Sequence, residues 1–304
     1  MSPQLDLFGH AHPERQSDGT DPAAEALAAC HREAADLARR ISPRIRFGTS
    51  SWSFPGWKGL VYSAGATETS LARDGLREYA QHPLLRTVGI DRSYYAPIPD
   101  DDLRRYASQL PAGFLACAKA PALVTAAELP GRGGGANPEF MSASRLIDDL
   151  LAPFDRSFAA FAGPFILEFP PVRAAAGLDG RTFLRRLDRL LGALPPRFRY
   201  AVEIRNRQFL TPEYARVLVT HGAGHVYNYW SAMPMPGDQT AIVAPESLPF
   251  AVVRLLLAPG TWYEDQRARF RPFNRIVVED RTMRAQAVSI ARRVAAMDRE
   301  ASSS

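Results

Sequence analysis

The chain has 304 residues, 46% of them hydrophobic, and a net charge of +5, which suits a globular protein of one large domain or two small ones. It has no apolar run of the roughly 20 residues that a membrane helix needs, and no basic stretch followed by an apolar one at its start, so we expect neither a membrane span nor a signal peptide. Cys30 and Cys117 match no zinc or redox spacing, and we therefore expect a cytoplasmic protein.

Almost all the basic residues are arginines, since Lys58 and Lys119 are the only lysines. We interpret this as codon bias, because many arginines alternate with acids on helical stretches, which is typical of a solvated face. Phosphate or nucleic-acid binding is the alternative, because arginine pairs bidentately with phosphate. A lysine kept in an arginine-rich chain indicates that an amine is needed there, which draws attention to Lys119.

The first 43 residues differ from the rest. Residues 1–20 are polar and rich in Gly, Pro and His, which predicts a disordered tail. Asp21 as N-cap and Pro22 at the first helical position predict a helix within 21–43, which Pro43 ends. Residues 44–298 form the main domain, and we expect disorder again at 299–304.

From residue 44 onward, short apolar runs alternate with amphipathic helical patterns, which predicts a parallel sheet with crossover helices. The count of about eight strands favours an α/β protein with a closed (β/α)8 barrel of the TIM type. The expected strands are 45–48, 87–91, 114–119, 165–169, 200–204, 225–229, 251–256 and 276–279. Helices are expected at 99–109, 178–194, 211–220 and 282–297.

Two stretches depart from a regular barrel. Residues 124–137 are long and glycine-rich, and we expect a mobile loop at the active face. Residues 233–249 are proline-rich and show no convincing helical pattern, so the barrel should be irregular around strands 6 and 7.

The loop after the first strand is the most distinctive stretch. Trp52 and Trp57 stand there among glycines and hydroxyl side chains. Indole rings are costly to leave in water, so we expect both to roof a pocket at the mouth of the barrel.

Polar side chains gather where the expected strands end, which is where TIM-type barrels hold their functional residues. Asp91, Lys119, Glu168 and Glu203 are the expected catalytic residues. Substrate contacts are expected from Trp52, Trp57, Tyr95, Arg205, Asn228 and Arg254. Charges inside apolar runs need partners, so a structural salt-bridge network, for instance Glu203 with Arg254, is the plainer interpretation of any one of them.

Several motifs resemble the domain of unknown function 72 (YecE-like) family over about residues 44–297. They are Gly48-Thr49-Ser50-Ser51-Trp52 with Pro55-Gly56-Trp57, Gly89-Ile90-Asp91-Arg92-Ser93-Tyr94-Tyr95, Lys119-Ala120-Pro121, Phe169-Pro170-Pro171 and Ala201-Val202-Glu203-Ile204-Arg205. The resemblance implies a TIM-type barrel with a pocket at the strand ends and no established reaction.

The chain also departs from that family's usual pattern. Gly89 and Asp91 stand where Glu and Asn are usual, Glu168 replaces a Gln, and Leu256-Leu257 replaces a His-Gly. An Asn pair usual after strand eight falls near Glu279-Asp280. The carboxylates of this chain thus stand at other positions than in the family's usual pattern. Catalytic roles carried over from relatives are correspondingly less well supported.

The tail carries a second resemblance. Gln4, Leu5, Asp6, Leu7 and Phe8 resemble the short peptide by which bacterial replication and repair proteins bind the DNA sliding clamp. Leu7 and Phe8 would enter an apolar groove while Gln4 makes hydrogen bonds. A tail that packs Leu5 and Phe8 back on the barrel is the alternative.

We favour a hydrolase acting on a phosphorylated or nucleic-acid-related substrate, with a possible role in DNA replication or repair. A divalent metal such as Mg, Mn or Zn is a candidate cofactor, with Glu168, Glu203, His225 and Glu279 as candidate ligands. Three alternatives stay open: a glycosidase-like enzyme that uses Glu168 and Glu203, a non-catalytic ligand-binding barrel, and a Schiff-base role for Lys119.

Overall fold

The protein is described from a computed structural model, which covers residues 22–129, 135–173, 177–256, 258, 260, 261 and 263–301. The strands are β1 (Phe47–Thr49), β2 (Leu85–Ile90), β3 (Leu115–Lys119), β4 (Ala162–Phe169), β5 (Tyr200–Ile204), β6 (Gly224–Tyr229) and β7 (Ala251–Leu255). The longer helices are α1 (Pro22–Arg40), α2 (Glu68–Asp74), α4 (Asp100–Ala107), α7 (Ala152–Ser157), α8 (Gly180–Ala193), α9 (Pro212–His221), α11 (Tyr263–Phe270) and α12 (Arg281–Ala301). Four-residue helices are α3 (Leu76–Tyr79), α5 (Ala122–Thr125), α6 (Ala143–Leu146) and α10 (Pro236–Gln239).

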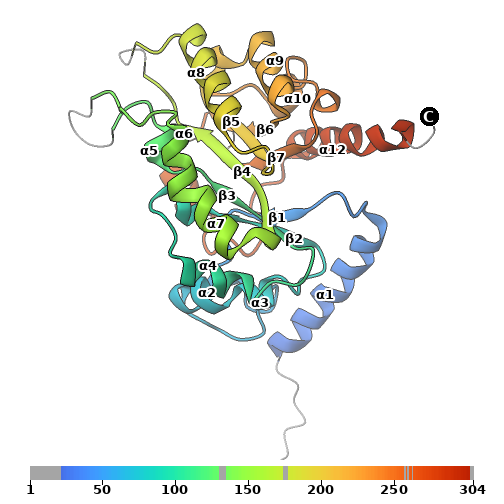
Figure 1. The fold of residues 1–304 in the computed structure, drawn as a ribbon. Helices are drawn as coiled ribbons and strands as arrows, with labels where there is room; N and C mark the ends of the chain where they lie inside the picture. Colours follow the sequence, from blue (N-terminus) through green and yellow to red (C-terminus); the bar gives the residue numbers. More distant parts are fainter. Residues whose placement is uncertain are drawn as a thin grey trace, which may run out of the picture.

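Seven parallel strands form one curled sheet in the order β1-β2-β3-β4-β5-β6-β7 (Figure 1). Each strand pairs with the next along the chain, because a helix-containing crossover carries the chain back between them. The expected α/β class and barrel-like curl are confirmed. Among the described residues β1 and β7 end the sheet without pairing to each other, so the ring is open.

The prediction of an eighth strand at 276–279 is wrong, because this stretch forms neither a helix nor a strand. Its side chains Ile276, Val277 and Val278 are 70%, 40% and 49% exposed. The preceding turn is held at the loop after β1, where the Trp57 indole N–H donates to the Phe273 carbonyl at 2.9 Å. The chain therefore stays at this end of the sheet instead of descending to begin another parallel strand.

The helices begin and end as their sequences predict. The side-chain oxygens of Asp179 and Thr211 accept hydrogen bonds from the Thr182 and Tyr214 amides, which caps α8 and α9. Gly222 ends α9 in the left-handed conformation, with φ of 59°. In the proline-rich stretch at 233–249, where no helix was expected, Pro236 begins the single turn α10.

Other expected features lie partly outside the description. Part of the glycine-rich loop at 124–137 and the whole of residues 1–21 fall outside the described residues, so the clamp-like peptide does too. None of the described helices is long and apolar enough to cross a bilayer.

Side chains that alternate along the strands divide the core in two. Outside the sheet, aromatic rings such as Phe165, Phe169 and Phe183 pack under the helices. Inside the curl, Ile166, Ala201 and Val226 form a separate small apolar cluster. Glu168, Glu203 and Asn228 follow these three residues by two positions, so the period of two puts polar groups directly above an apolar layer.

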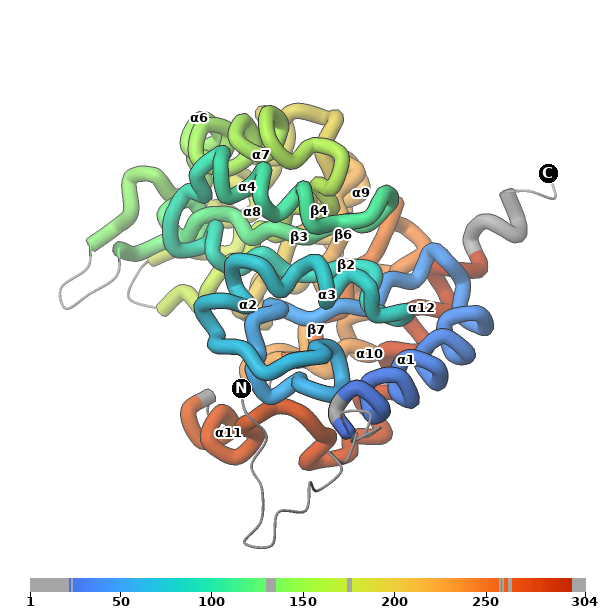
Figure 2. The backbone as a smooth tube through the Cα atoms, turned by 90° about the horizontal axis from the view of Figure 1, so that it is seen from below, coloured from blue at the N-terminus to red at the C-terminus, as the bar shows by residue number. Residues whose placement is uncertain are grey.

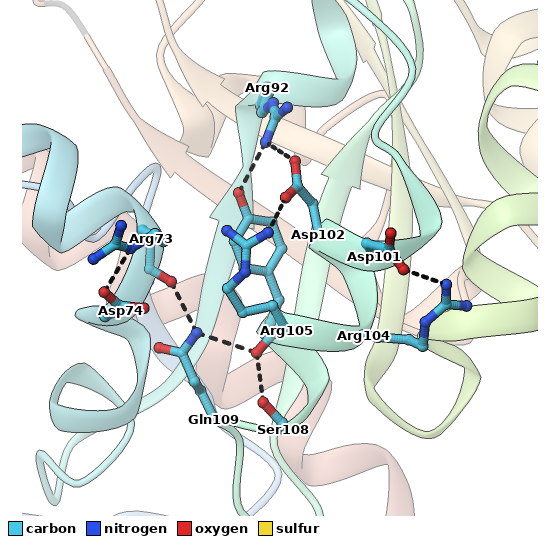
Figure 3. A network of polar contacts seen from close by, with 10 residues as sticks. Arg73, Asp74, Arg92, Asp101, Asp102, Arg104, Arg105, Ser108 and Gln109 are labelled. Atoms are coloured by element: carbon cyan, nitrogen blue, oxygen red, sulfur yellow. Dashed lines mark hydrogen bonds and ion pairs between the residues drawn. The ribbon is translucent and has the colours of Figure 1, made fainter.

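A polar network on the outer side of the molecule fixes the end of β2 (Figure 3). Arg92, immediately after Asp91, donates to the Asp102 carboxylate of α4 at 2.7 Å. Gln109 donates to the carbonyls of Arg73 and Arg105 at 3.0 and 3.1 Å, tying α2 to α4. Figure 2 shows these helices lying outside the first strands, while α11 stands apart at the edge of the molecule.

The close approach of β1 and β2 yields a stability prediction. A Cβ at Gly48 would lie 2.1 Å from the Thr87 carbonyl oxygen, whereas one at Gly180 would meet nothing closer than 3.9 Å. We expect Gly48→Ala to lower the free energy of unfolding by about 3 kcal/mol or more, because the strands must separate. Gly180→Ala, at the start of α8, should be neutral or stabilise by up to about 1 kcal/mol. Urea unfolding measures both, and equal values for the two variants would contradict this packing.

Candidate functional site

Six charged side chains from the ends of five strands meet inside the curl of the sheet. Lys119, Glu168, Glu203 and Arg254 lie on β3, β4, β5 and β7, and Asp91 and Arg205 follow β2 and β5. The register pairs Glu168 with Glu203 and Asn228 with Arg254, and β5 pairs with β6 through Val202 and His225. Because all strands are parallel, their carboxyl ends share one mouth, as the sequence predicted.

One oxygen atom lies at the centre of this cluster. The Glu168 Oε2 atom forms ion pairs with Lys119 Nζ at 3.1 Å, Arg205 Nη2 at 3.0 Å and Arg254 Nη1 at 2.7 Å. Burial alone would raise the pKa of Glu168, but these three cations together hold it below its usual value. Glu168 is therefore a carboxylate at neutral pH.

Glu203 is the most deeply buried acid of the site. Its side chain is 0% exposed and is held by Arg205 Nε at 3.0 Å and by Arg254. Burial by itself would lower the pKa of Arg254, but Glu203 and Glu168 outweigh it and raise that pKa. The pairing of Glu203 with Arg254, proposed above as the plainer interpretation, is present, and it joins β5 to β7 across β6.

The rim of the cluster is open to solvent. Asp91 is 33% exposed and pairs with Lys119 Nζ at 2.9 Å, while Lys119 itself is 12% exposed. The Lys119 ammonium lies 5.5 Å from the Tyr94 ring centroid, and the Arg205 guanidinium lies 4.0 Å from that of Trp230. Three acids and three bases make the cluster neutral, with its cationic groups braced by aromatic faces.

Sequence reasoning did not single out some of the residues that hold this cluster in place. The hydroxyl of Ser93 is buried and donates to the carbonyls of Ile90 and Lys119 at 2.9 and 2.7 Å. This bond ties the end of β2 to the end of β3. Ser93 lies in the Gly89–Tyr95 motif, two residues after Asp91. The alternation of side chains that selected Asp91 therefore also pointed to Ser93.

Three expected substrate contacts lie elsewhere. Trp52 is 5% exposed, and its indole N–H donates to the Leu71 carbonyl at 2.9 Å, so it belongs to the core under α2. Trp57 packs against Phe54 and Tyr62 and contacts Phe273. Tyr95 is 83% exposed and meets Tyr94 edge-on. The expectation that Trp52 roofs a pocket does not fit its burial.

Asn228 and His225 belong to a buried network behind the cluster. Gln239, also fully buried, donates to the Asn228 carbonyl at 2.8 Å, and its Oε1 lies 3.1 Å from His225 Nε2. The His225 Nδ1 atom lies 2.9 Å from the Tyr214 hydroxyl. Since the Gln239 amide nitrogen already faces carbonyls, its oxygen accepts from His225 Nε2–H. Burial lowers the pKa of His225 to about 4, so the ring is neutral.

The four candidate metal ligands are not brought together. Glu168 and Glu203 are paired with cationic side chains, and Glu279 pairs with Arg284 at 3.0 Å. Both ring nitrogens of His225 are hydrogen-bonded, one to Gln239 and the other to Tyr214. Across the described ranges no group of three or more His, Cys, Asp or Glu is arranged to hold a metal ion.

The chain belongs to the family described as protein of unknown function DUF72, whose model matches residues 46–301. None of the curated proteins matches it. A DUF72 protein from Thermotoga maritima MSB8 is 17% identical, with a TM-score of 0.54 over 82% of this chain and 89% of that one, which shows a shared fold. A DUF72 protein from Enterococcus faecalis V583 is 14% identical, with a TM-score of 0.48 over 83% and 94%.

Neutral, buried His225 predicts a pH dependence of stability. An unfolded histidine has a pKa near 6.5, so between pH 6.5 and about 4 the unfolded chain binds a proton that folded His225 does not. The contribution of His225 to the free energy of unfolding is fully present above pH 6.5. It falls by roughly 3 kcal/mol as the pH drops to 4.

Urea unfolding at pH 7.5, 6, 5 and 4 measures this slope. His225→Gln should flatten it, because glutamine does not titrate. His82 is the matched control, because burial and His31 lower its pKa to about 4 as well. His82→Gln should leave the His225 part of the slope in place. An unchanged slope in His225→Gln would contradict the assignment.

Proposed function

We propose that this DUF72 protein is a hydrolase that acts on a phosphorylated or nucleic-acid-related substrate at the mouth formed by the strand ends. One observation carries the proposal: Lys119, Arg205 and Arg254 converge within 3.1 Å of a single carboxylate oxygen. Such a set of donors suits the anionic oxygens of a phosphoryl group, for which the fixed guanidinium forks supply paired hydrogen bonds. Solvent-accessible Asp91 and Lys119 stand at the entrance.

The residues divide into two roles. Glu168 and Glu203 position the cations, since each forms ion pairs with both arginines. Asp91 acts as general base: it takes a proton from a water molecule as the water oxygen bonds to phosphorus. The ester P–O bond breaks in the same step, and the leaving oxygen takes a proton from the Lys119 ammonium.

The glycosidase alternative has less support. It requires one carboxylic acid that is protonated near neutral pH. The pKa of Glu168 is shifted the opposite way, and Glu203 is enclosed by two arginines. A non-catalytic barrel would need only the ion pairs, and the hydrolysis assay below separates it from an enzyme.

A divalent cation is not needed for this scheme. Mg, Mn and Zn require free carboxylate or imidazole donors, and Glu168 and Glu203 already accept from cations here. As arranged, the residues do not fit a metal ion, and we derive no step through one.

Recruitment to DNA replication or repair is the second part of the proposal. It rests only on residues 4–8, whose sequence resembles the clamp-binding peptide. A short apolar and hydrogen-bonding motif of this kind binds grooves as an extended segment. The partner would be a bacterial DNA sliding clamp.

Hydrolysis of p-nitrophenyl phosphate and bis(p-nitrophenyl) phosphate tests the reaction. We expect Asp91→Asn and Lys119→Met each to lower kcat/KM by about 100-fold or more, because each removes a proton-transfer group. Asp188→Asn on α8, an exposed acid that pairs with His221, is the control and should keep full activity. Absence of hydrolysis by the unmodified protein, or full activity in Asp91→Asn, would sink the proposal.

Fluorescence polarisation with a labelled bacterial sliding clamp tests recruitment. The full chain should bind, and Leu7→Ala combined with Phe8→Ala should weaken binding at least tenfold by removing the apolar anchors. Gln16→Ala, elsewhere in the same tail, serves as the control. Equal binding by the chain and its double variant would rule out this peptide as the clamp ligand.

A further inference from the structure

A second hollow lies at the opposite end of the sheet from the charged cluster. It is a surface pocket of about 400 Å³, built where the chain enters β1, β2 and β3. Arg46 precedes β1, Arg86 is the second residue of β2, and Phe114 precedes β3. Arg86 and Asp91 are five residues apart on one extended segment, so roughly 16 Å separates this pocket from the mouth.

The pocket is cationic. Arg46 and Arg86 both line it, and no Asp or Glu is among its lining residues. The Arg46 Nη1 atom donates to the carbonyls of Gly113 at 2.9 Å and Arg86 at 3.4 Å, which fixes this guanidinium between the starts of β2 and β3. In the described part of the chain the Arg86 guanidinium has no acidic partner within 4 Å.

The rest of the lining is mixed. Pro83 and Leu85 contribute apolar surface, and Phe114, which is 4% exposed, lies beneath. His82 also lines the pocket, and its ring meets that of His31 on α1 edge-on at 5.0 Å. Burial and His31 lower the pKa of His82 to about 4, so at neutral pH it offers a neutral imidazole beside the two arginines. The His31 Nε2 atom behind it is buried and has no hydrogen-bond partner among the described residues.

We propose that this pocket binds a small phosphate-bearing molecule of nucleotide size, with its phosphate on Arg46 and Arg86 and its ring against Pro83 and Leu85. Arginine is the side chain best suited to phosphate, and pockets of 300–1,000 Å³ that combine apolar walls with a few fixed polar groups are typical of small-molecule sites. The fixed Arg46 guanidinium loses little freedom when the ligand binds, which favours affinity.

The site is separate from the proposed hydrolase site. Its residues lie at the amino ends of the first three strands and in the linkers that precede them, whereas the charged cluster lies at the carboxyl ends of the strands. Occupancy of one end of the sheet does not require activity at the other. Failure of either proposal therefore leaves the other standing.

Isothermal titration calorimetry with AMP, inorganic phosphate and adenosine tests the proposal. AMP should bind most tightly, inorganic phosphate more weakly, and adenosine more weakly than AMP by at least tenfold, because it lacks the phosphate. Arg46→Gln and Arg86→Gln should each weaken AMP binding at least tenfold. Arg189→Gln on α8, an exposed arginine outside the pocket, should change the Kd by less than twofold.

Two controls keep the outcome clear. Arg46 donates to two carbonyls, so its variant can lose stability. The Arg86 side chain makes no hydrogen bond or ion pair with the described residues, so Arg86→Gln should keep the unmodified melting temperature. Asp91→Asn, at the other end of the sheet, should bind AMP like the unmodified chain. Equal AMP affinity in Arg86→Gln and the unmodified protein would overturn the proposal, as would AMP binding that Asp91→Asn abolishes.

Discussion

The ion pair between Glu203 and Arg254 is the interaction on which the inside of the sheet depends. A fully buried carboxylate is unfavourable unless cations and hydrogen bonds surround it, and removing one partner of such a pair costs about 3–5 kcal/mol. Arg254 on β7 can meet Glu203 on β5 only if β6 holds both neighbours in register, and it pairs Asn228 opposite Arg254. The pair therefore fixes the order and level of three strands at once.

The same strand geometry explains why the charged side chains lie next to an apolar layer. Ile166, Ala201 and Val226 form an apolar layer, and the next residues that face inward are Glu168, Glu203 and Asn228. A pleated strand turns alternate side chains to one face, so a two-residue step moves from the dry layer to the charged one. Natural cores rarely keep ion pairs for stability alone, since apolar replacements often do as well. This cluster reaches solvent at Asp91, which is 33% exposed.

Much of this could be predicted from the sequence because it depends on local pattern. Alternating short apolar runs and helical patterns predict the seven strands, and the residues at helix ends predict the caps. The shared direction of the strands predicts that their ends converge, which brings together Lys119, Glu168, Glu203 and Arg254. The eighth strand could not, because Ile276, Val277 and Val278 have the composition of a strand while the turn before them is held by Trp57. The buried positions of Trp52, His225 and Asn228 could not be predicted for a related reason: a polar or aromatic residue looks alike in sequence whether its partner is a substrate or, as for His225, a buried Gln239.

The break between β1 and β7 affects how copies of this chain meet one another. An unpaired strand edge is a template on which another chain can add a strand. β1 is only three residues long, which leaves few backbone groups for a neighbour, and β7 turns the charged Arg254 inward beside its open edge. Both are devices that proteins use against edge-to-edge aggregation.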